Sequence, residues 1–153
     1  MKKSSLRYLC ASALMALSTT AGAQGVINTI SRTGISGYGG DGGPANVAVL
    51  SAPSGVATDA AGNIYIADKN NHRVRKIDAS TGEISTFVGN GTYGYTGMGG
   101  DAALASIKYP SALYFDHDGN LFVNDNFNDI VFKVDGSTHM IHNHCGDGHQ
   151  GSS

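Results

Sequence analysis

The chain repeats itself at a fixed interval of 57 residues, and this repeat restricts the fold more than any other feature of the sequence. Residues 27–96 aligned with residues 84–153 share 26 identities in 70 positions, without an insertion or deletion. Chance would leave only a few identities, so the two segments are copies of one structural unit. The first unit spans residues 35–91 and the second spans residues 92–148.

Each unit contains four short runs rich in β-branched and aromatic residues. Asp, Asn and Gly lie between the runs and favour tight reversals of the chain. The sequence therefore predicts a four-stranded meander in each unit, with one helical turn within residues 45–52 and no other helix. The predicted strands of the first unit are 56–59, 64–67, 73–77 and 84–88.

A small twisted sheet hides both of its faces only by stacking between similar sheets, as blades do in a β-propeller. The predicted fold class is therefore all-β, a partial β-propeller of tandem four-stranded blades. Residues 24–34 are predicted to be the outer strand of a preceding blade, and residues 149–153 the start of the next loop.

Three segments of the first unit resemble the NHL-repeat family, in the Gly-Asp-Gly-Gly-rich type common in bacterial secreted propellers. They are GYGGDGGPA, GNIYIAD and NNHRVRKID, and residues 71–73 (NHR) stand at the triplet that names the family. The second unit departs from the pattern, with NDI at 128–130 and Met98 in place of Asp41. The resemblance implies a scaffold that binds protein, glycan or nucleic acid, and in some relatives lyase or lactonase chemistry on a central metal.

The first residues have the pattern of a secretory signal peptide. Three basic residues precede an apolar run over 8–17, and Ala21-Gly22-Ala23 supplies the small residues of a cleavage site. The run is too short to span a bilayer. We therefore expect residues 1–23 to be removed and residues 24–153 to be secreted or periplasmic.

Removal of the leader would change the charge balance. The ten basic residues fall to seven against twelve acidic ones, a net charge of −5. Such a surface gives no footprint for nucleic acid or an anionic membrane. Cys145 would be the one remaining cysteine, so no internal disulfide is expected, and no second apolar segment reaches transmembrane length.

Two blades leave the question of how a ring is completed, because propellers typically contain about four to eight blades. Three explanations are open. The chain is a truncated part of a larger propeller, which we favour; or it closes a ring as a homo-oligomer, for instance three chains for six blades; or it is a two-blade stack.

The segment 139–149 gathers four histidines and Cys145, which are ligand types for zinc or copper. In a strand His142 and His144 would share a face. By register, however, the segment is the fourth strand and glycine loop of the second unit, and no ligands stand at these columns elsewhere. We therefore favour a drifted strand and predict no metal ligands or cofactor.

The acidic residues are interpreted as structural. Asp41 in the first glycine cluster is a turn cap or a calcium ligand, and we favour the cap because its equivalent is Met98. The aspartates that border turns in both units are also predicted to be caps; they are Asp59, Asp116, Asp68, Asp125, Asp78 and Asp135.

The basic and aromatic residues leave alternatives open. Arg73 and Arg75 fall on one face of a strand, either as solvated or salt-bridged charges, which we favour, or paired with a neighbouring blade or an acidic partner. A set of loop tyrosines either forms a contact surface for a protein or glycan partner or plugs the junction between blades. These are Tyr38, Tyr93, Tyr95 and Tyr109.

The sequence thus predicts an exported NHL-repeat module that acts as a binding or scaffolding surface. The alternative is a fragment of a metal-dependent propeller lyase or hydrolase. The predicted innermost strands, 56–59 and 113–116, offer one carboxylate each, and Ser-His-Asp, phosphate-loop and HExxH patterns are absent from the sequence. We therefore favour a non-enzymatic role and predict no catalytic residues.

Overall fold

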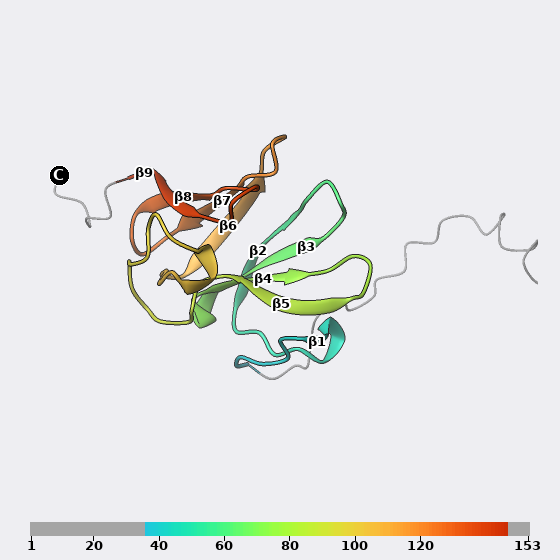
Figure 1. Ribbon diagram of the computed structural model, residues 1–153. Coiled ribbons are helices and arrows are strands. Elements are labelled where there is room, and N and C mark those ends of the chain that lie inside the picture. The colour runs from blue at the N-terminus through green and yellow to red at the C-terminus, as the bar shows by residue number, and fades with distance from the viewer. Residues whose placement is uncertain (1–35, 147–153) are drawn as a thin grey trace, which may run out of the picture.

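The computed structural model describes residues 36–146, which form two antiparallel sheets that meet along β2 and β6 (Figure 1). The strand order is β1-β5-β4-β3-β2 in the first sheet and β6-β7-β8-β9 in the second. The predicted leader, the predicted strand at 24–34 and the loop at 149–153 lie outside the described residues. The strands are β1 (Gly43–Pro44), β2 (Pro53–Thr58), β3 (Ile64–Asp68), β4 (Arg73–Ile77), β5 (Glu83–Val88), β6 (Pro110–Phe115), β7 (Leu121–Asp125), β8 (Ile130–Val134) and β9 (Ile141–Cys145).

The all-β prediction is confirmed, and each unit forms the expected meander. The strand β4 has the predicted bounds, and the other strands of the first unit differ at their ends by one to three residues. The predicted helical turn is the 3₁₀ turn η1 (Ala45–Val47). The prediction of no other helix is wrong, because η2 (Lys69–Asn71) follows β3 and η3 (Ala102–Leu104) repeats η1 in the second unit.

The glycine loop adds a pairing that the sequence did not indicate, since β1 extends the first sheet beside β5. The amide of Gly42 donates to the carbonyl of Ile84 at 2.8 Å, and one repeat later Gly99 donates to Ile141 at 2.7 Å. Within the same loop Gly40 has a φ of 89°, and a Cβ on Gly40 would lie 2.8 Å from the Cα of Ala48. The loop therefore needs glycine both for its conformation and for its space.

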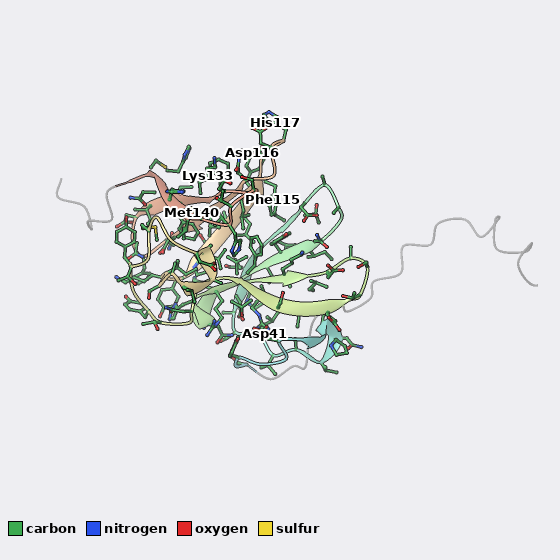
Figure 2. The ribbon with its side chains drawn as sticks, in the orientation of Figure 1. Asp41, Phe115, Asp116, His117, Lys133 and Met140 are labelled. Atoms are coloured by element: carbon green, nitrogen blue, oxygen red, sulfur yellow. The ribbon has the colours of Figure 1, made fainter. Side chains whose placement is uncertain are left out.

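Aspartates close the hairpin turns as predicted. Asp59 accepts hydrogen bonds from the amides of Ala61 and Asn63 at 3.0 and 2.9 Å. Asp116 does the same one repeat later, below the turn tip that carries His117 (Figure 2). The side chain of Asn120 also donates to Asp116, at 2.8 Å, and this hydrogen bond lowers the pKa of Asp116 the most, followed by those from the two amides. The turns are thus closed by ionised carboxylates near neutral pH.

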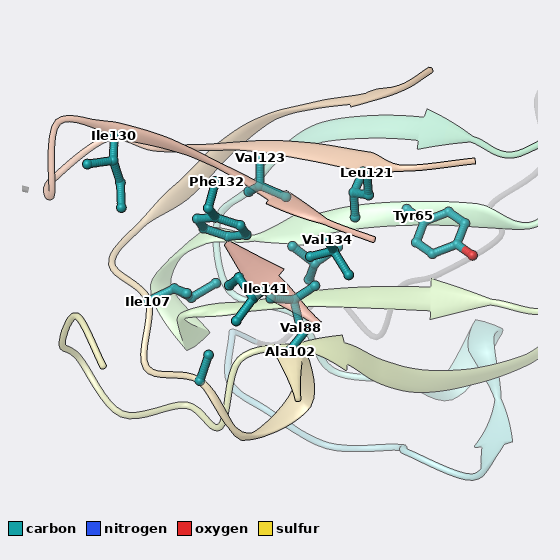
Figure 3. Close-up of a cluster of buried hydrophobic side chains, with 12 residues drawn as sticks. Tyr65, Val88, Ala102, Ile107, Leu121, Val123, Ile130, Phe132, Val134 and Ile141 are labelled. Carbon is teal, nitrogen blue, oxygen red and sulfur yellow. The ribbon is translucent and has the colours of Figure 1, made fainter. Parts of the chain in front are cut away.

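The main hydrophobic core lies between the two sheets (Figure 3). Tyr65 and Val88 of the first sheet pack with Phe132 and Ile141 of the second. Phe115 partly covers this core and lies 4.6 Å from Tyr65 between ring centroids. Each unit therefore stabilises the other, as expected for stacked blades.

The innermost strands approach each other closely at one glycine. A Cβ added to Gly55 of β2 would collide with the carbonyl oxygen of Ser111 in β6. Beside this point the hydroxyl of Ser54 donates to the carbonyl of Pro110 at 3.0 Å. The lack of a side chain at residue 55 therefore fixes how near the two blades lie.

Asp41 is not a turn cap, and that prediction is wrong. It lies beside β5 (Figure 2) and accepts hydrogen bonds from the hydroxyls of Thr86, at 2.6 Å, and Tyr38, at 2.8 Å. It also forms an ion pair with Arg75, whose side chain is fully buried and lies 3.4 Å from Asp68. Asp41 thus attaches the glycine loop to the sheet.

The pKa of Asp41 reflects the same contacts. Burial alone would raise the pKa, but the hydrogen bonds from Thr86 and Tyr38 and the charge of Arg75 outweigh it. The net result is a pKa below the ordinary value. Asp41 is therefore ionised near neutral pH, as its pairing with a guanidinium requires.

The second unit replaces this ion pair with apolar packing. Met98 stands at the position of Asp41, and Phe132 at the position of Arg75. Phe132 is fully buried, and Met98 and Tyr95 pack against the core to which it belongs. Met98 and Phe132 therefore replace Asp41 and Arg75 as a pair, so that neither charge of the ion pair is left alone in the second unit.

Candidate binding surface

Two buried carboxylates hold the loops at one end of the sheets. Asp125, at the end of β7, accepts hydrogen bonds from the amide of Lys108 and the side chain of Asn128, both at 2.8 Å. Asp68, at the end of β3, accepts from the amide of Ser51 at 2.7 Å. Asp68 and Asp125 thus do more than cap the turns that they border, because each also binds the end of the long glycine loop of its unit.

These loops bring four aromatic side chains together, which we call the aromatic cluster: His72, Tyr93, Tyr109 and Phe127. The ring centroids of His72 and Tyr109 are 4.8 Å apart, and those of Tyr109 and Phe127 are 4.9 Å apart. Tyr93 lies 5.3 Å from His72 and 5.8 Å from Tyr109. Most of the pairs meet edge to face, which is the favourable geometry for aromatic rings.

The aromatic cluster is partly exposed and has cationic neighbours. Tyr93 is 49% exposed and Phe127 is 44% exposed. The ammonium of Lys108 lies 4.8 Å from the ring centroid of Tyr93, and that of Lys69 lies 6.0 Å from Tyr109. The surface therefore offers apolar ring area together with positive charge, on a chain whose net charge is negative.

His72 connects the two units within this surface. It has a left-handed backbone at φ 53°, and its Nδ1 accepts a hydrogen bond from the amide of Tyr109 at 3.4 Å. Burial lowers the pKa of His72, so the imidazole is neutral at pH 7. The accepting Nδ1 leaves the proton on Nε2, which makes His72 a hydrogen-bond donor at its other nitrogen.

The two interpretations of the tyrosines apply to different residues. Tyr93 and Tyr109 belong to the aromatic cluster, whereas Tyr95 packs against the core between the sheets. Tyr38 is held by its own unit: the guanidinium of Arg73 lies 4.2 Å from its ring centroid, and its hydroxyl donates to Asp41. Tyr38 is thus a bridge within the first unit.

The arginines also serve their own unit. Arg75 is salt-bridged as expected, but it is buried rather than solvated. Arg73 donates to the carbonyls of Gly89 and Asn90 at 2.9 and 2.6 Å. Within residues 36–146, neither arginine pairs with a carboxylate of the second unit.

Sequence reasoning missed His72 and Phe127 as members of the surface. Phe127 stands in a polar turn where the first unit has Asn70, and this exchange of a polar for an aromatic residue was the available signal. His72 gave no such signal, because its neighbours Tyr93 and Tyr109 come from a distant loop.

The histidine-rich segment does not assemble a ligand set among the described residues. Between residues 36 and 146, no three His, Cys, Asp or Glu side chains lie close enough to hold a metal ion. His142 and His144 are exposed on β9, and His139 instead meets Asp101, with 3.0 Å from Nδ1 to the carboxylate oxygen. His149 lies outside the described residues.

Two packed four-stranded meanders, joined by the long loop between β5 and β6, define a module of β-propeller blades. Residues 50–77 match the family model of the NHL repeat, so the first unit contains an NHL repeat. The match runs from the end of the glycine loop through β4. Comparison with curated proteins found no match.

A similar solved structure is selenomethionine-substituted virginiamycin B lyase from Staphylococcus aureus. The two share 14% sequence identity with a TM-score of 0.44, over 60% of this chain and 26% of the lyase. This chain therefore spans about a quarter of the lyase's length. A likeness at this level carries no information about activity.

No helix among the described residues has the length and apolar character needed to cross a membrane.

Proposed function

We propose that this chain is an exported binding module and that the aromatic cluster is its contact surface. The observation that carries the proposal is the pair of half-exposed rings, Tyr93 and Phe127, with Lys69 and Lys108 beside the cluster. Aromatic residues concentrate binding energy because they bury much area at little conformational cost. The NHL repeat at residues 50–77 is consistent with a scaffold role.

The lysines specify the kind of partner. A ligand that stacks on Tyr93 meets the ammonium of Lys108, so carboxylate groups on the ligand are favoured. A protein segment with acidic and aromatic residues has this chemistry, and so does a glycan that contains uronic acid. Neutral glycans lack the charge and should bind less tightly.

Binding to defined probes tests the proposal. The purified protein is titrated with acidic aromatic peptides, uronic-acid polysaccharides and neutral polysaccharides, and calorimetry measures the affinities. Tyr93→Ala and Phe127→Ala should each lower the affinity for the probe that binds by about 30-fold or more, as expected for contact hot spots. Val47→Ala, which changes an exposed apolar residue outside the aromatic cluster, is the matched control and should leave this affinity unchanged.

Two results would contradict the proposal. One is the absence of binding by all three probe classes. The other is binding that Tyr93→Ala and Phe127→Ala leave intact while the fold, followed by circular dichroism, is unchanged. Loss of binding in Lys108→Gln with a weaker dependence on salt would support the role of charge.

A further inference from the structure

One face of the second sheet is open, although the same face of the first sheet is buried. We call it the downstream face, because in the first sheet it faces the unit that follows in sequence. There Tyr65, Ala67 and Val74 are at most 3% exposed. On the second sheet Tyr114 is 65% exposed, and a shallow hollow of about 180 Å³ is lined by Ala112, Leu113, Tyr114, Phe122, Asn124 and Val131.

The opposite side of the first sheet, the upstream face, is partly covered by the glycine loop, whose Ala45 and Ala48 pack with Ile77 and Ile84, and it is open along β2. Val56 is 64% exposed there, whereas its equivalent Leu113 packs against the core between the sheets. A pocket of about 400 Å³ lies at the first sheet, and its lining includes Ala45, Ile64, Ile77 and Gly82. Among the described residues, the chain thus has one open face of each kind.

Within the chain, the counterpart of this pocket is occupied. Ala102, Leu121 and Val134 are equivalent to Ala45, Ile64 and Ile77, and they pack in one core with Tyr65 of the preceding sheet. Phe87 of the first sheet packs against the same core. Its ring centroid lies 4.6 Å from that of His139, the residue that stands at the position of Gly82 in the second unit. An aromatic pair from the downstream face therefore fills this place at the internal junction.

The open downstream face presents the same aromatic pair. The rings of Tyr65 and Phe87 are 4.9 Å apart at an angle of 77°. The equivalent rings of Phe122 and His144 are 4.8 Å apart at 75°. The pair Phe122 and His144 thus has the same geometry as Tyr65 and Phe87, which pack against the upstream face of the second sheet.

Side-chain sizes on the open faces are exchanged relative to the internal junction. Inside the chain, the small Gly55 and Ala57 belong to the downstream face, and the large Leu113 and Phe115 belong to the upstream face. On the open faces the downstream residue is the large Tyr114, and the upstream residues are the smaller Val56 and Thr58. The two open faces therefore match in volume, with large residues opposite small ones.

We propose that a second copy of this chain is the occupant of these faces. The downstream face of one copy docks on the upstream face of the next, and Phe122 and His144 enter the pocket beside Gly82. Ala112 stands where the internal junction has Gly55, so the innermost strands of two copies stay further apart than β2 and β6. Such a head-to-tail contact is heterologous and produces a closed ring or a filament.

Substitutions on each face separate this arrangement from other contacts. Tyr114→Asp blocks the downstream face and Val56→Asp blocks the upstream face, and both positions are exposed in the single chain. The protein as recovered from expression should form an assembly of several chains. Each variant alone should have the mass of one chain, measured by sedimentation velocity at several concentrations.

Mixing the two variants is the decisive step. Each retains one intact face, so an equimolar mixture should form a dimer of one copy of each and nothing larger. Leu104→Asp replaces a similarly exposed apolar residue, at 72%, outside both faces and should leave the assembly intact. Thermal unfolding followed by circular dichroism shows that each variant folds.

Three results would overturn the proposal. The first is wild-type protein that remains a single chain at every concentration. The second is assembly that survives Val56→Asp or Tyr114→Asp. The third is a mixture of the two variants that stays monomeric. None of these results depends on the ligand of the aromatic cluster, because Tyr93 and Phe127 lie on neither face.

Discussion

The ion pair of the first unit should be strongly coupled in energy, because the second unit loses both of its members together. Asp41→Met and Arg75→Phe each install one half of the Met98–Phe132 pair, and the double variant installs both. We expect each single substitution to destabilise the protein and the second substitution to restore most of the loss.

The magnitudes follow from burial. Asp41→Met leaves the fully buried Arg75 with Asp68, 3.4 Å away, as its remaining charge partner. Breaking a buried pair costs about 3–5 kcal/mol, and since the Asp41 side chain is one-third exposed we expect about 2–3 kcal/mol. Arg75→Phe leaves the carboxylate of Asp41 beside an apolar ring without its counter-ion, which we expect to cost about 2–3 kcal/mol by the same reasoning.

The double variant should lie within about 1 kcal/mol of wild type, because apolar residues often replace a buried ion pair at little cost. Asp68 would then resemble Asp125, which is buried in the second unit opposite no arginine. The coupling energy between the two substitutions is therefore about 4 kcal/mol.

Urea unfolding of the four proteins measures this cycle, with Tyr114→Asp present throughout so that association between chains does not contribute. A cycle on Lys76 and Asp78, a partly exposed pair 3.9 Å apart, is the matched control and should show no measurable coupling. A double variant that loses the sum of the two single losses would refute the reasoning, because the pair would then act as two independent residues.

Three further predictions concern single features. Burial raises the pKa of Asp125 despite hydrogen bonds from Lys108 and Asn128, so wild type should gain stability relative to Asp125→Asn as the pH falls from 7 to about 4; a difference independent of pH would contradict this. Gly55→Ala should destabilise the protein by about 3 kcal/mol in chemical unfolding, because its Cβ meets backbone, whereas Gly43→Ala, 3.5 Å from the nearest atom, should cost far less. Expressed in a bacterial host, the chain should be recovered from the periplasm or medium with Gln24 as its first residue, and mass spectrometry showing an intact leader there would exclude cleavage after Ala23.

The strands, their order within each unit and the turn caps could be predicted from the sequence because they depend on local chemistry. A period of 57 residues fixes which segments are equivalent, and Asp59 or Asp116 closes its turn with amides two and four residues away. No knowledge of distant residues is needed for these features. The short strand β1 was missed because its partner β5 lies about forty residues further along the chain.

The contacts between distant segments were decided by the tertiary structure alone. Arg75 looked like a surface charge, since nothing near it in sequence shows that Asp41, 34 residues earlier, would cover it. The aromatic cluster likewise joins a turn of the first unit to a loop and a turn of the second. The sequence by itself determined two copies of one blade, whereas the packing between them determined which charges are buried, which rings are exposed and which faces remain open. The physical reason is that burial depends on every segment that approaches a residue in space, and a repeat specifies only the segments adjacent in the chain.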